Sequence, residues 1–353
     1  MDKIIKKLEN EHCLSLDEYE YLITNRNEKI QLLLADKARK VRESVYGKDV
    51  FIRGLIEIGN VCKNNCFYCG IRRGNKECDR YRLTENEILS CCDEGYLLGF
   101  RTFVMQGGED TYFSDEFMCN VIRKIKSKYP DCAVTLSIGE RSYESYKKMF
   151  DAGADRYLLR HETADKEHYE KLHPYEMSFD NRMECLNNLK KIGYQTGCGF
   201  MVGSPYQTNL NIAKDLKFIE QFNPDMCGVG PFIPHKSTQF KDFNAGNGEL
   251  TCYLLSVIRL MKPEILLPST TALGTILPNG HTMGLIAGAN VIMPNLSPVS
   301  VRKKYELYDN KKSMGDEAAQ AVATLGEKVK SAGYRIVTKR GDVKRKENQN
   351  GCI

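Results

Sequence analysis

Ile52-Arg53-Gly54-Leu55-Ile56-Glu57-Ile58 is a short run of apolar, β-prone residues in a chain of 353 residues. Seven similar runs follow it, at residues 102–106, 133–137, 156–160, 197–202, 226–230, 265–269 and 290–293. Charged stretches with helical periodicity lie between them, at residues 84–95, 114–129, 142–151, 165–192, 208–222, 248–262 and 279–287. Strand and helix are therefore predicted to alternate along most of the chain.

This alternation predicts parallel strands joined by crossover helices, and about 250 residues is the usual size of a closed barrel. We expect an α/β fold with a (β/α)8 TIM-type barrel over residues 50–334. An open doubly wound sheet is the alternative. Residues 1–49 are predicted to form an N-terminal helical extension, because Ser15 and Glu18 have the spacing of a capping box. Residues 335–353, basic and poor in apolar side chains, are expected to be a basic flexible tail.

Composition argues against several classes of partner. The formal net charge is +5, and residues 335–347 supply most of it, so a general nucleic-acid or membrane surface is not expected. Residues 265–301 contain no charged side chain, but proline and glycine interrupt them too often for a membrane span. The first ten residues are charged and do not resemble a signal peptide, which favours a cytoplasmic location.

Three of the fourteen cysteines stand apart by their spacing. Cys62, Cys66 and Cys69 follow the first predicted strand as C-x3-C-x2-C, whereas the others are scattered through apolar runs and are interpreted as buried hydrophobes. Three thiolates on one loop can each bind one iron of an iron–sulfur cube and leave the fourth iron without a protein ligand. The alternatives are a zinc site, which needs a nearby fourth ligand, and a thioredoxin-like pair, which would not use Cys62.

Two short motifs and several longer blocks carry a resemblance to a known family. The cysteine spacing with Tyr68 before the third cysteine, and Gly107-Gly108-Glu109 after the second strand, resemble motifs of the radical S-adenosylmethionine (SAM) superfamily. Residues 80–84, 106–110, 155–165, 228–235, 269–278 and 288–295 are similar to the FeFe-hydrogenase maturase HydE family. Biotin synthase and methylornithine synthase are related to this family.

The resemblance implies two cofactors: one 4Fe-4S cluster held by Cys62, Cys66 and Cys69, and SAM bound at its open iron. Reductive cleavage of SAM would give a 5′-deoxyadenosyl radical. The resemblance places Tyr68 beside the adenine and Arg182 at the methionyl carboxylate. The full set of residues expected to bind the cofactor is Tyr68, Gln106, Gly107, Gly108, Glu109, Ser137, Glu162, Arg182, Met226 and Met293.

In such a barrel, residues at the carboxyl ends of the strands converge on one cavity. The family's substrate is anionic and contains iron, so positive charges and hydroxyl donors are expected there. The catalytic candidates are Arg53, Arg160, Thr270, Thr271 and Tyr305. The resemblance also implies an electron donor and other maturases as partners.

Two other functions remain open from the sequence. A biotin-synthase-like or methylornithine-synthase-like enzyme would act on a small organic substrate, in a cavity with fewer arginines. A non-enzymatic iron–sulfur protein would use the same thiolates. We expect a single cluster, because no cysteine lies between Cys252 and Cys352.

Overall fold

The strands close into a ring. In the computed structural model, which describes residues 1–311 and 318–344, six parallel strands lie in the order β2 (Gly54–Gly59), β3 (Thr102–Gly107), β4 (Ala133–Ser137), β5 (Arg156–Leu158), β6 (Gln195–Cys198) and β8 (Met226–Cys227). Parallel bridges continue the ring through the pairs Met226–Leu266, Pro268–Val291 and Leu55–Asn295. The predicted α/β barrel is confirmed, and the open sheet is wrong, because the eighth segment pairs with the first.

Two smaller sheets accompany the ring: β1 (Asp49–Ile52) pairs with β10 (Val291–Ile292) and β11 (Arg335–Val337), and β7 (Met201–Val202) pairs with β9 (Gly230–Pro231). The helices after residue 60 are α4 (Glu85–Leu97), α5 (Asp115–Lys128), α6 (Tyr143–Asp151), α7 (Lys166–Leu172), α8 (Phe179–Ile192), α9 (Asn209–Phe222), α10 (Gly248–Met261), α11 (Thr271–Ile276), α12 (Gly280–Ile286), α13 (Val299–Arg302) and α14 (Ala318–Ser331). The sequence pattern does not predict α11 and α13, because six and four residues are too few to show helical periodicity.

Side-chain caps decide where the outer helices begin. The Thr84 hydroxyl accepts a hydrogen bond from the backbone N–H of Glu87, and the Glu87 carboxylate accepts one from the N–H of Thr84. Thr208 and Asn211 form the same reciprocal pair at the start of α9. Each cap satisfies backbone donors that the first helical turn leaves unpaired. The capping residues precede the amphipathic runs, so the helices begin close to where the sequence predicts them.

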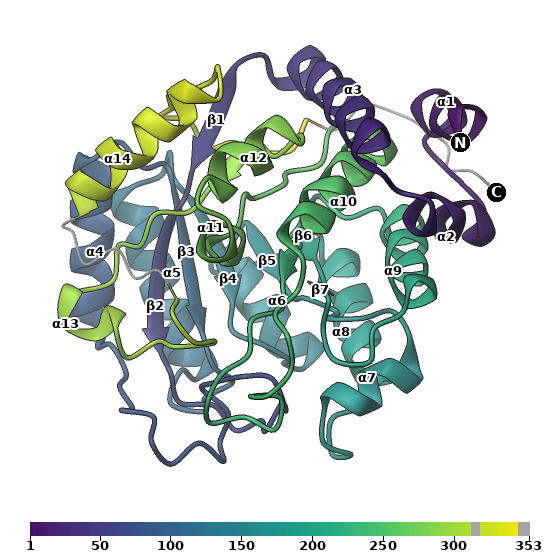
Figure 1. The fold of residues 1–353 in the computed structure, drawn as a ribbon. Helices are drawn as coiled ribbons and strands as arrows, with labels where there is room; N and C mark the ends of the chain where they lie inside the picture. Colours follow the sequence, from purple (N-terminus) through teal and green to yellow (C-terminus); the bar gives the residue numbers. More distant parts are fainter. Residues whose placement is uncertain (312–317, 345–353) are drawn as a thin grey trace.

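The N-terminal extension is helical, as predicted, and packs on the outside of the barrel. It consists of α1 (Asp2–Glu11), α2 (Leu16–Thr24) and α3 (Glu28–Tyr46), which lie beside α9 and α10 (Figure 1). The Tyr19 hydroxyl donates to Glu220 Oε2 over 2.7 Å, and the Tyr253 hydroxyl donates to the Leu22 carbonyl over 2.7 Å. Leu22 and Ile23 belong to the same hydrophobic core as the barrel. In the described part of the chain, no helix is both long and apolar enough to cross a bilayer.

The segment after α14 differs from the flexible tail that composition predicts. β11 pairs with β1, and the chain then crosses the amino end of the barrel, where Asp342 Oδ1 lies 2.6 Å from Arg156 Nη2. The Arg340 carbonyl accepts a hydrogen bond from the Thr102 hydroxyl over 2.8 Å. Residues 335–344 therefore lie against the barrel, because their charges have partners that are distant in sequence. Residues 345–353 lie outside the described residues.

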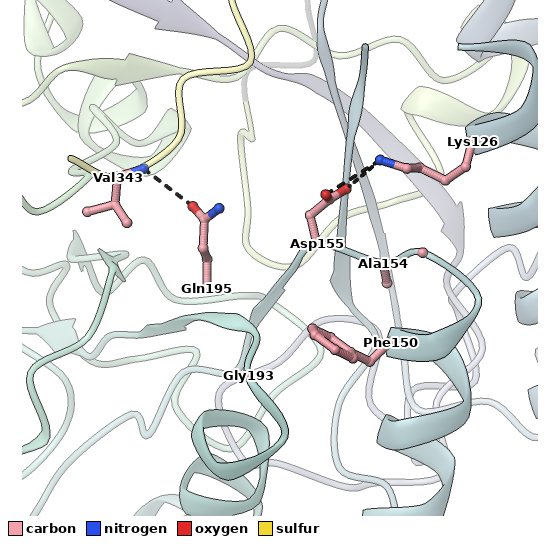
Figure 2. A pocket seen from close by; sticks show the side chains of 8 residues that line it. Lys126, Phe150, Ala154, Asp155, Gly193, Gln195 and Val343 are labelled. Atoms are coloured by element: carbon pink, nitrogen blue, oxygen red, sulfur yellow. Dashed lines mark hydrogen bonds and ion pairs between the residues drawn. The ribbon is translucent and has the colours of Figure 1, made fainter. Parts of the chain in front are cut away.

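Figure 2 shows this amino end, with Val343 beside Gln195 and with Lys126 paired to Asp155 around a surface pocket. The closing turn needs a glycine. Gly341 has φ 61°, and a β-carbon there would lie 2.6 Å from the Phe51 ring. The C-terminal segment thus seals the end of the barrel opposite to the cysteine loop.

The Arg156–Asp342 pair should contribute to stability in a pH-dependent way. Burial opposes ionisation of Asp342, but hydrogen bonds from Arg340 and the charge of Arg156 together lower the pKa of its carboxyl. A lowered folded-state pKa stabilises the fold at neutral pH, and this contribution is lost as the pH falls below about 4. We expect Asp342→Asn to lower the free energy of unfolding at pH 7 by about 2 kcal/mol, less than for a fully buried pair, because the Asp342 side chain is 38% exposed.

Urea unfolding at pH 7 and below pH 4 measures this effect, and the difference between wild type and variant should shrink at the lower pH. Asp151→Asn, which breaks the exposed Lys147–Asp151 pair, is the control and should cost less than about 0.5 kcal/mol. Equal losses in the two variants would contradict a special role for the Arg156–Asp342 pair.

Candidate functional site

The loop after β2 carries the three closely spaced cysteines and is held by three separate segments. The backbone N–H of Lys63 donates to the Glu109 carbonyl over 2.8 Å, and that of Phe67 donates to the Leu172 carbonyl over 3.0 Å. The N–H of Gly70 donates to the Leu307 carbonyl over 2.8 Å. The segment after β3, the last residue of α7 and the segment after α13 therefore fix the cysteine loop at the carboxyl end of the barrel.

The three cysteines lie close together and are partly buried. Burial raises the pKa of Cys62, raises that of Cys66 well above its usual range, and raises that of Cys69 to about 12. The neighbouring Cys69 and Cys62 raise the pKa of Cys66 further. Such thiols become thiolates readily only when positive charge is bound beside them, as a metal centre supplies. The donor set therefore fits an iron–sulfur cluster ligated by these cysteines.

Cys78, the next cysteine along the chain, is oriented differently. Its sulfur lies 3.5 Å from Asn60 Nδ2, and the same Asn60 amide also donates to the Asp79 and Lys304 carbonyls. Within residues 1–311 and 318–344, no three His, Cys, Asp or Glu side chains gather around a position for a single metal ion, which is the arrangement that a zinc site requires.

The end of β3 touches the cysteine loop through a glycine. A β-carbon on Gly108 would overlap the Val61 carbonyl oxygen and would lie 2.7 Å from Cys62 Cβ. The backbone N–H of Glu109 points at Cys62 Sγ over 3.4 Å. The Glu109 carboxylate accepts a hydrogen bond from the Glu140 N–H over 2.9 Å and is thereby held. The predicted glycine motif thus brings a backbone donor to the Cys62 thiol.

Gln106 and Ser137 lie beside this contact. They are paired residues at the ends of β3 and β4. Gln106 Nε2 donates to the hydroxyl oxygen of Tyr305 over 3.2 Å, and Tyr305 is buried. Gly107 is bridged to Gly59 at the end of β2. The structure therefore brings Gln106, Ser137 and Tyr305 together at the carboxyl rim.

Arg182 is buried rather than exposed on a helix surface. It lies in the first turn of α8, where its Nε contacts Glu140 Oε1 and its Nη1 donates to the Arg160 carbonyl over 2.7 Å. The charges of Glu162 and Arg182 both act on the Tyr68 phenol, whose pKa burial raises well above its usual range. Tyr68, Glu162 and Arg182 are therefore neighbours at the cysteine loop.

Arg160 and Glu162 form an ion pair whose polar atoms are not saturated by hydrogen bonds. Arg160 Nη2 lies 3.2 Å from Glu162 Oε2. Within the described residues, Arg160 Nε and Nη2 and Glu162 Oε2 are buried and have no hydrogen-bond partner. Glu162 also has φ 67°, an unusual value for a residue other than glycine. Buried unpaired polar atoms and backbone strain together mark functional sites.

A cavity at the same end contains several other candidates. Thr271 and Met293 line it with Glu57, Asn295 and Lys311. Thr270 lies next to this cavity, but its hydroxyl caps α11 by accepting from the Leu273 N–H over 3.3 Å. The sequence predicts that the Thr270 hydroxyl donates to the substrate, whereas in the structure this hydroxyl caps a helix.

Arg53 and Met226 are not brought to this cluster. Arg53 Nη1 lies 3.0 Å from Met226 Sδ, and the nearby charge of Arg156 affects the pKa of Arg53, which burial lowers. Both residues stand at the amino end, because Arg53 precedes the first residue of β2 and Met226 opens β8. The sequence places Arg53 in the first strand run. It does not show that Arg53 lies at the amino end of that strand and not at its carboxyl end.

Sequence reasoning missed a buried ion pair at the carboxyl end. Glu57 is fully buried on β2, and its carboxylate contacts Lys311 Nζ and accepts from Asn295 Nδ2 over 2.8 Å. Lys311 Nζ also donates to the Tyr305 carbonyl over 2.8 Å. The single carboxylate of Glu57 within an apolar strand could have indicated a buried charge from the sequence alone. Its partner Lys311 lies too far along the chain to be inferred.

We expect Cys66→Ala to abolish the visible absorption of the reconstituted cluster, because it removes one of three iron ligands. Cys92→Ala, which alters a buried cysteine of α4, should retain that absorption. Anaerobic reconstitution with iron and sulfide, followed by absorption spectroscopy and iron analysis, makes the comparison. Equal loss in both variants would mean that the spacing identifies the wrong thiols.

Gly108→Ala tests the contact between β3 and the cysteine loop. The added methyl group would displace Val61 and Cys62, so we expect severalfold lower cluster content after reconstitution. Gly326→Ala on α14 is the control, because its β-carbon would have no neighbour closer than 4.0 Å. Normal cluster content in Gly108→Ala would contradict the requirement for glycine.

Comparisons with known proteins agree with this geometry. Residues 56–219 match the family model of the radical SAM superfamily. The chain is 45% identical over 274 residues to the FeFe hydrogenase maturase subunit HydE of Thermotoga maritima, covering 78% of each chain. It is 29% identical over 311 residues to 3-methylornithine synthase of Methanosarcina acetivorans, covering 88% of this chain and 87% of that relative.

Two solved structures share the fold. The crystal structure of methylornithine synthase superposes with a TM-score of 0.83 at 25% identity and covers 95% of this chain and 97% of that one. HydG, a maturase of the FeFe hydrogenase, superposes with a TM-score of 0.78 at 22% identity, over 95% of this chain and 75% of HydG. This chain belongs to the FeFe-hydrogenase maturase HydE family of the radical SAM superfamily.

Proposed function

We propose that this protein is a radical SAM enzyme that helps to assemble the active-site subcluster of an FeFe hydrogenase. The single observation that carries the proposal is the junction of the three-thiol loop with the glycine end of β3 and the Arg182 side chain. Its family membership supports the same activity. The cofactors are one 4Fe-4S cluster and SAM.

The chain's own residues would hold and orient these cofactors. Cys62, Cys66 and Cys69 would bind the cluster, which when reduced supplies the electron that cleaves SAM to methionine and a 5′-deoxyadenosyl radical. Arg182 uses two of its five N–H donors on Glu140 and the Arg160 carbonyl, which leaves others for the methionyl carboxylate. Glu162 Oε2, which contacts Arg160 Nη2 as an ion pair but accepts no hydrogen bond, would accept from the ribose or the amine of SAM.

Gln106, Ser137, Met293 and the backbone at Gly107, Gly108 and Glu109 complete the proposed cofactor-binding set. Gln106 and Ser137 stand side by side on adjacent strands, so both can face the same part of the ligand. The backbone of residues 107–109 would receive the methionyl amine. The positions of Arg53 and Met226 at the amino end give neither of them a contact with the cysteine loop.

Arg160, Thr271 and Tyr305 are the proposed substrate-facing residues. Arg160 is ion-paired with Glu162, but its Nε and Nη2 make no hydrogen bond, and it lies at the rim that also holds Thr271 and Tyr305. A fixed guanidinium with free donors suits a small anionic substrate that contains iron. Such a substrate would come from another maturase, and an electron donor would reduce the cluster. The reduced thiols suit action in the cytoplasm.

A methylornithine-synthase-like or biotin-synthase-like reaction on a small organic molecule is the weaker alternative. The carboxylate that could bind a substrate ammonium group, Glu57, is already paired with Lys311 and Asn295. The lower identity to methylornithine synthase, 29% against 45%, agrees with this preference.

The test is anaerobic reconstitution followed by reduction in the presence of SAM. The wild type should produce 5′-deoxyadenosine well above background and should activate apo-hydrogenase together with the other maturases. Arg160→Ala should retain SAM binding and most 5′-deoxyadenosine formation but lose at least about tenfold in hydrogenase activation, since it removes substrate donors.

Arg123→Ala on the exposed face of α5 is the control and should behave as the wild type. A wild type that forms no 5′-deoxyadenosine would reject both enzymatic functions. Full activation by Arg160→Ala would remove Arg160 from the substrate site, and amino-acid turnover without hydrogenase activation would favour the alternative.

A further inference from the structure

His173 lies directly behind the tyrosine of the cysteine loop. It follows the last residue of α7 and is only 2% exposed. Its Nδ1 lies 2.9 Å from the Tyr169 carbonyl oxygen, and its Nε2 lies 3.1 Å from the Tyr68 hydroxyl. Both ring nitrogens are therefore engaged, one by the backbone of α7 and the other by the residue before Cys69.

These contacts define the direction of each hydrogen bond. A carbonyl oxygen can only accept, so the proton of the neutral ring sits on Nδ1. Nε2 is then an acceptor, and the Tyr68 hydroxyl must be the donor. Burial lowers the pKa of His173 to about 3, which agrees with a neutral ring. Tyr68 thus donates to one fixed lone pair.

The rings are also packed tightly. His173 stacks on Tyr169 with ring centroids 3.9 Å apart and an interplanar angle of 22°. It meets Tyr68 edge to face, with centroids 5.3 Å apart and an angle of 88°. A histidine held on one side by a stacked tyrosine therefore fixes both the hydroxyl and the ring plane of Tyr68.

The neighbouring residues of the two segments are paired as well. The Phe67 N–H donates to the Leu172 carbonyl over 3.0 Å, one residue before the Tyr68–His173 contact in both segments. Four residues after His173, Met177 Sδ lies 3.6 Å from Cys66 Sγ. The connection between α7 and α8 therefore runs along the cysteine loop and leads directly into the helix that carries Arg182.

From this arrangement we infer that His173 is a positioning residue for SAM, which locks Tyr68 in the orientation that the adenosyl group meets. The inference rests on the proposed function, in which Tyr68 lies beside the adenine. If the Tyr68 side chain could change rotamer freely, fixing it when SAM binds would cost conformational entropy. The Tyr68–His173 hydrogen bond fixes the side chain before SAM binds and so removes that cost. Tyr68 and His173 should therefore be energetically coupled in SAM binding.

A double-mutant cycle tests this coupling in the anaerobically reconstituted full chain. His173→Leu leaves the buried Tyr68 hydroxyl unpaired and should weaken SAM binding about tenfold. Tyr68→Phe removes the hydroxyl and should weaken binding about threefold. Because the unpaired hydroxyl is absent from the double variant, that variant should resemble Tyr68→Phe rather than multiply the two losses. His173→Gln, whose amide can still accept from Tyr68, should restore most of the affinity.

The measurements are the dissociation constant for SAM, the change that SAM causes in the electron paramagnetic resonance spectrum of the reduced cluster, and cluster content. His168→Leu is the matched control. His168 lies on the same helix, is 2% exposed and uses both ring nitrogens, on the Thr163 hydroxyl and the Pro205 carbonyl. It should lower the melting temperature as much as His173→Leu but leave SAM affinity within about twofold of wild type.

Additive losses in the cycle, or equal loss of SAM affinity in His168→Leu, would overturn the role of His173 while leaving the proposed function intact. Loss of cluster content in parallel with SAM affinity would show that His173 only supports the fold. A wild-type holoprotein that does not bind SAM would overturn the proposed function and the role of His173 together.

Discussion

Closure of the parallel ring is the constraint on which the site depends. Leu55 donates its backbone N–H to the Pro294 carbonyl over 2.9 Å and accepts from the Leu296 N–H over 2.7 Å, which joins the last strand segment to β2. Since all strands of the ring run in the same direction, their carboxyl ends meet at one rim. Groups far apart in the sequence, such as the cysteine loop and the Arg160–Glu162 pair, become neighbours there.

The two ends of the barrel use charge in opposite ways. At the amino end, Arg156 and Arg340 are matched by Asp342, Asp155 and backbone carbonyls, and the C-terminal segment covers them. At the carboxyl end, thiols with raised pKa values are buried, and buried atoms of the Arg160–Glu162 ion pair make no hydrogen bond. Unpaired buried groups cost stability, so they persist where a ligand completes them.

The cysteine loop has no regular secondary structure, yet its geometry is well determined. Backbone hydrogen bonds from Lys63, Phe67 and Gly70 reach three different segments, and Gly108 permits β3 to approach without a side chain between them. The connection between α7 and α8 adds the Tyr68–His173 contact on the remaining side. A loop held from several directions can keep three thiols at the separations that a cluster needs before the cluster binds.

The sequence by itself determined the barrel and the helix starts and singled out the three closely spaced cysteines, because these depend on local periodicity, local capping residues and short spacing. The tertiary structure alone decided that Arg53 stands at the amino end, that Thr270 caps a helix, and that Lys311 neutralises Glu57. It also decided that residues 335–344 pack against the amino end of the barrel and that His173 meets Tyr68. In each of these cases the outcome depends on a partner distant in sequence or on which end of a strand a residue occupies. Neither leaves a local pattern in the chain.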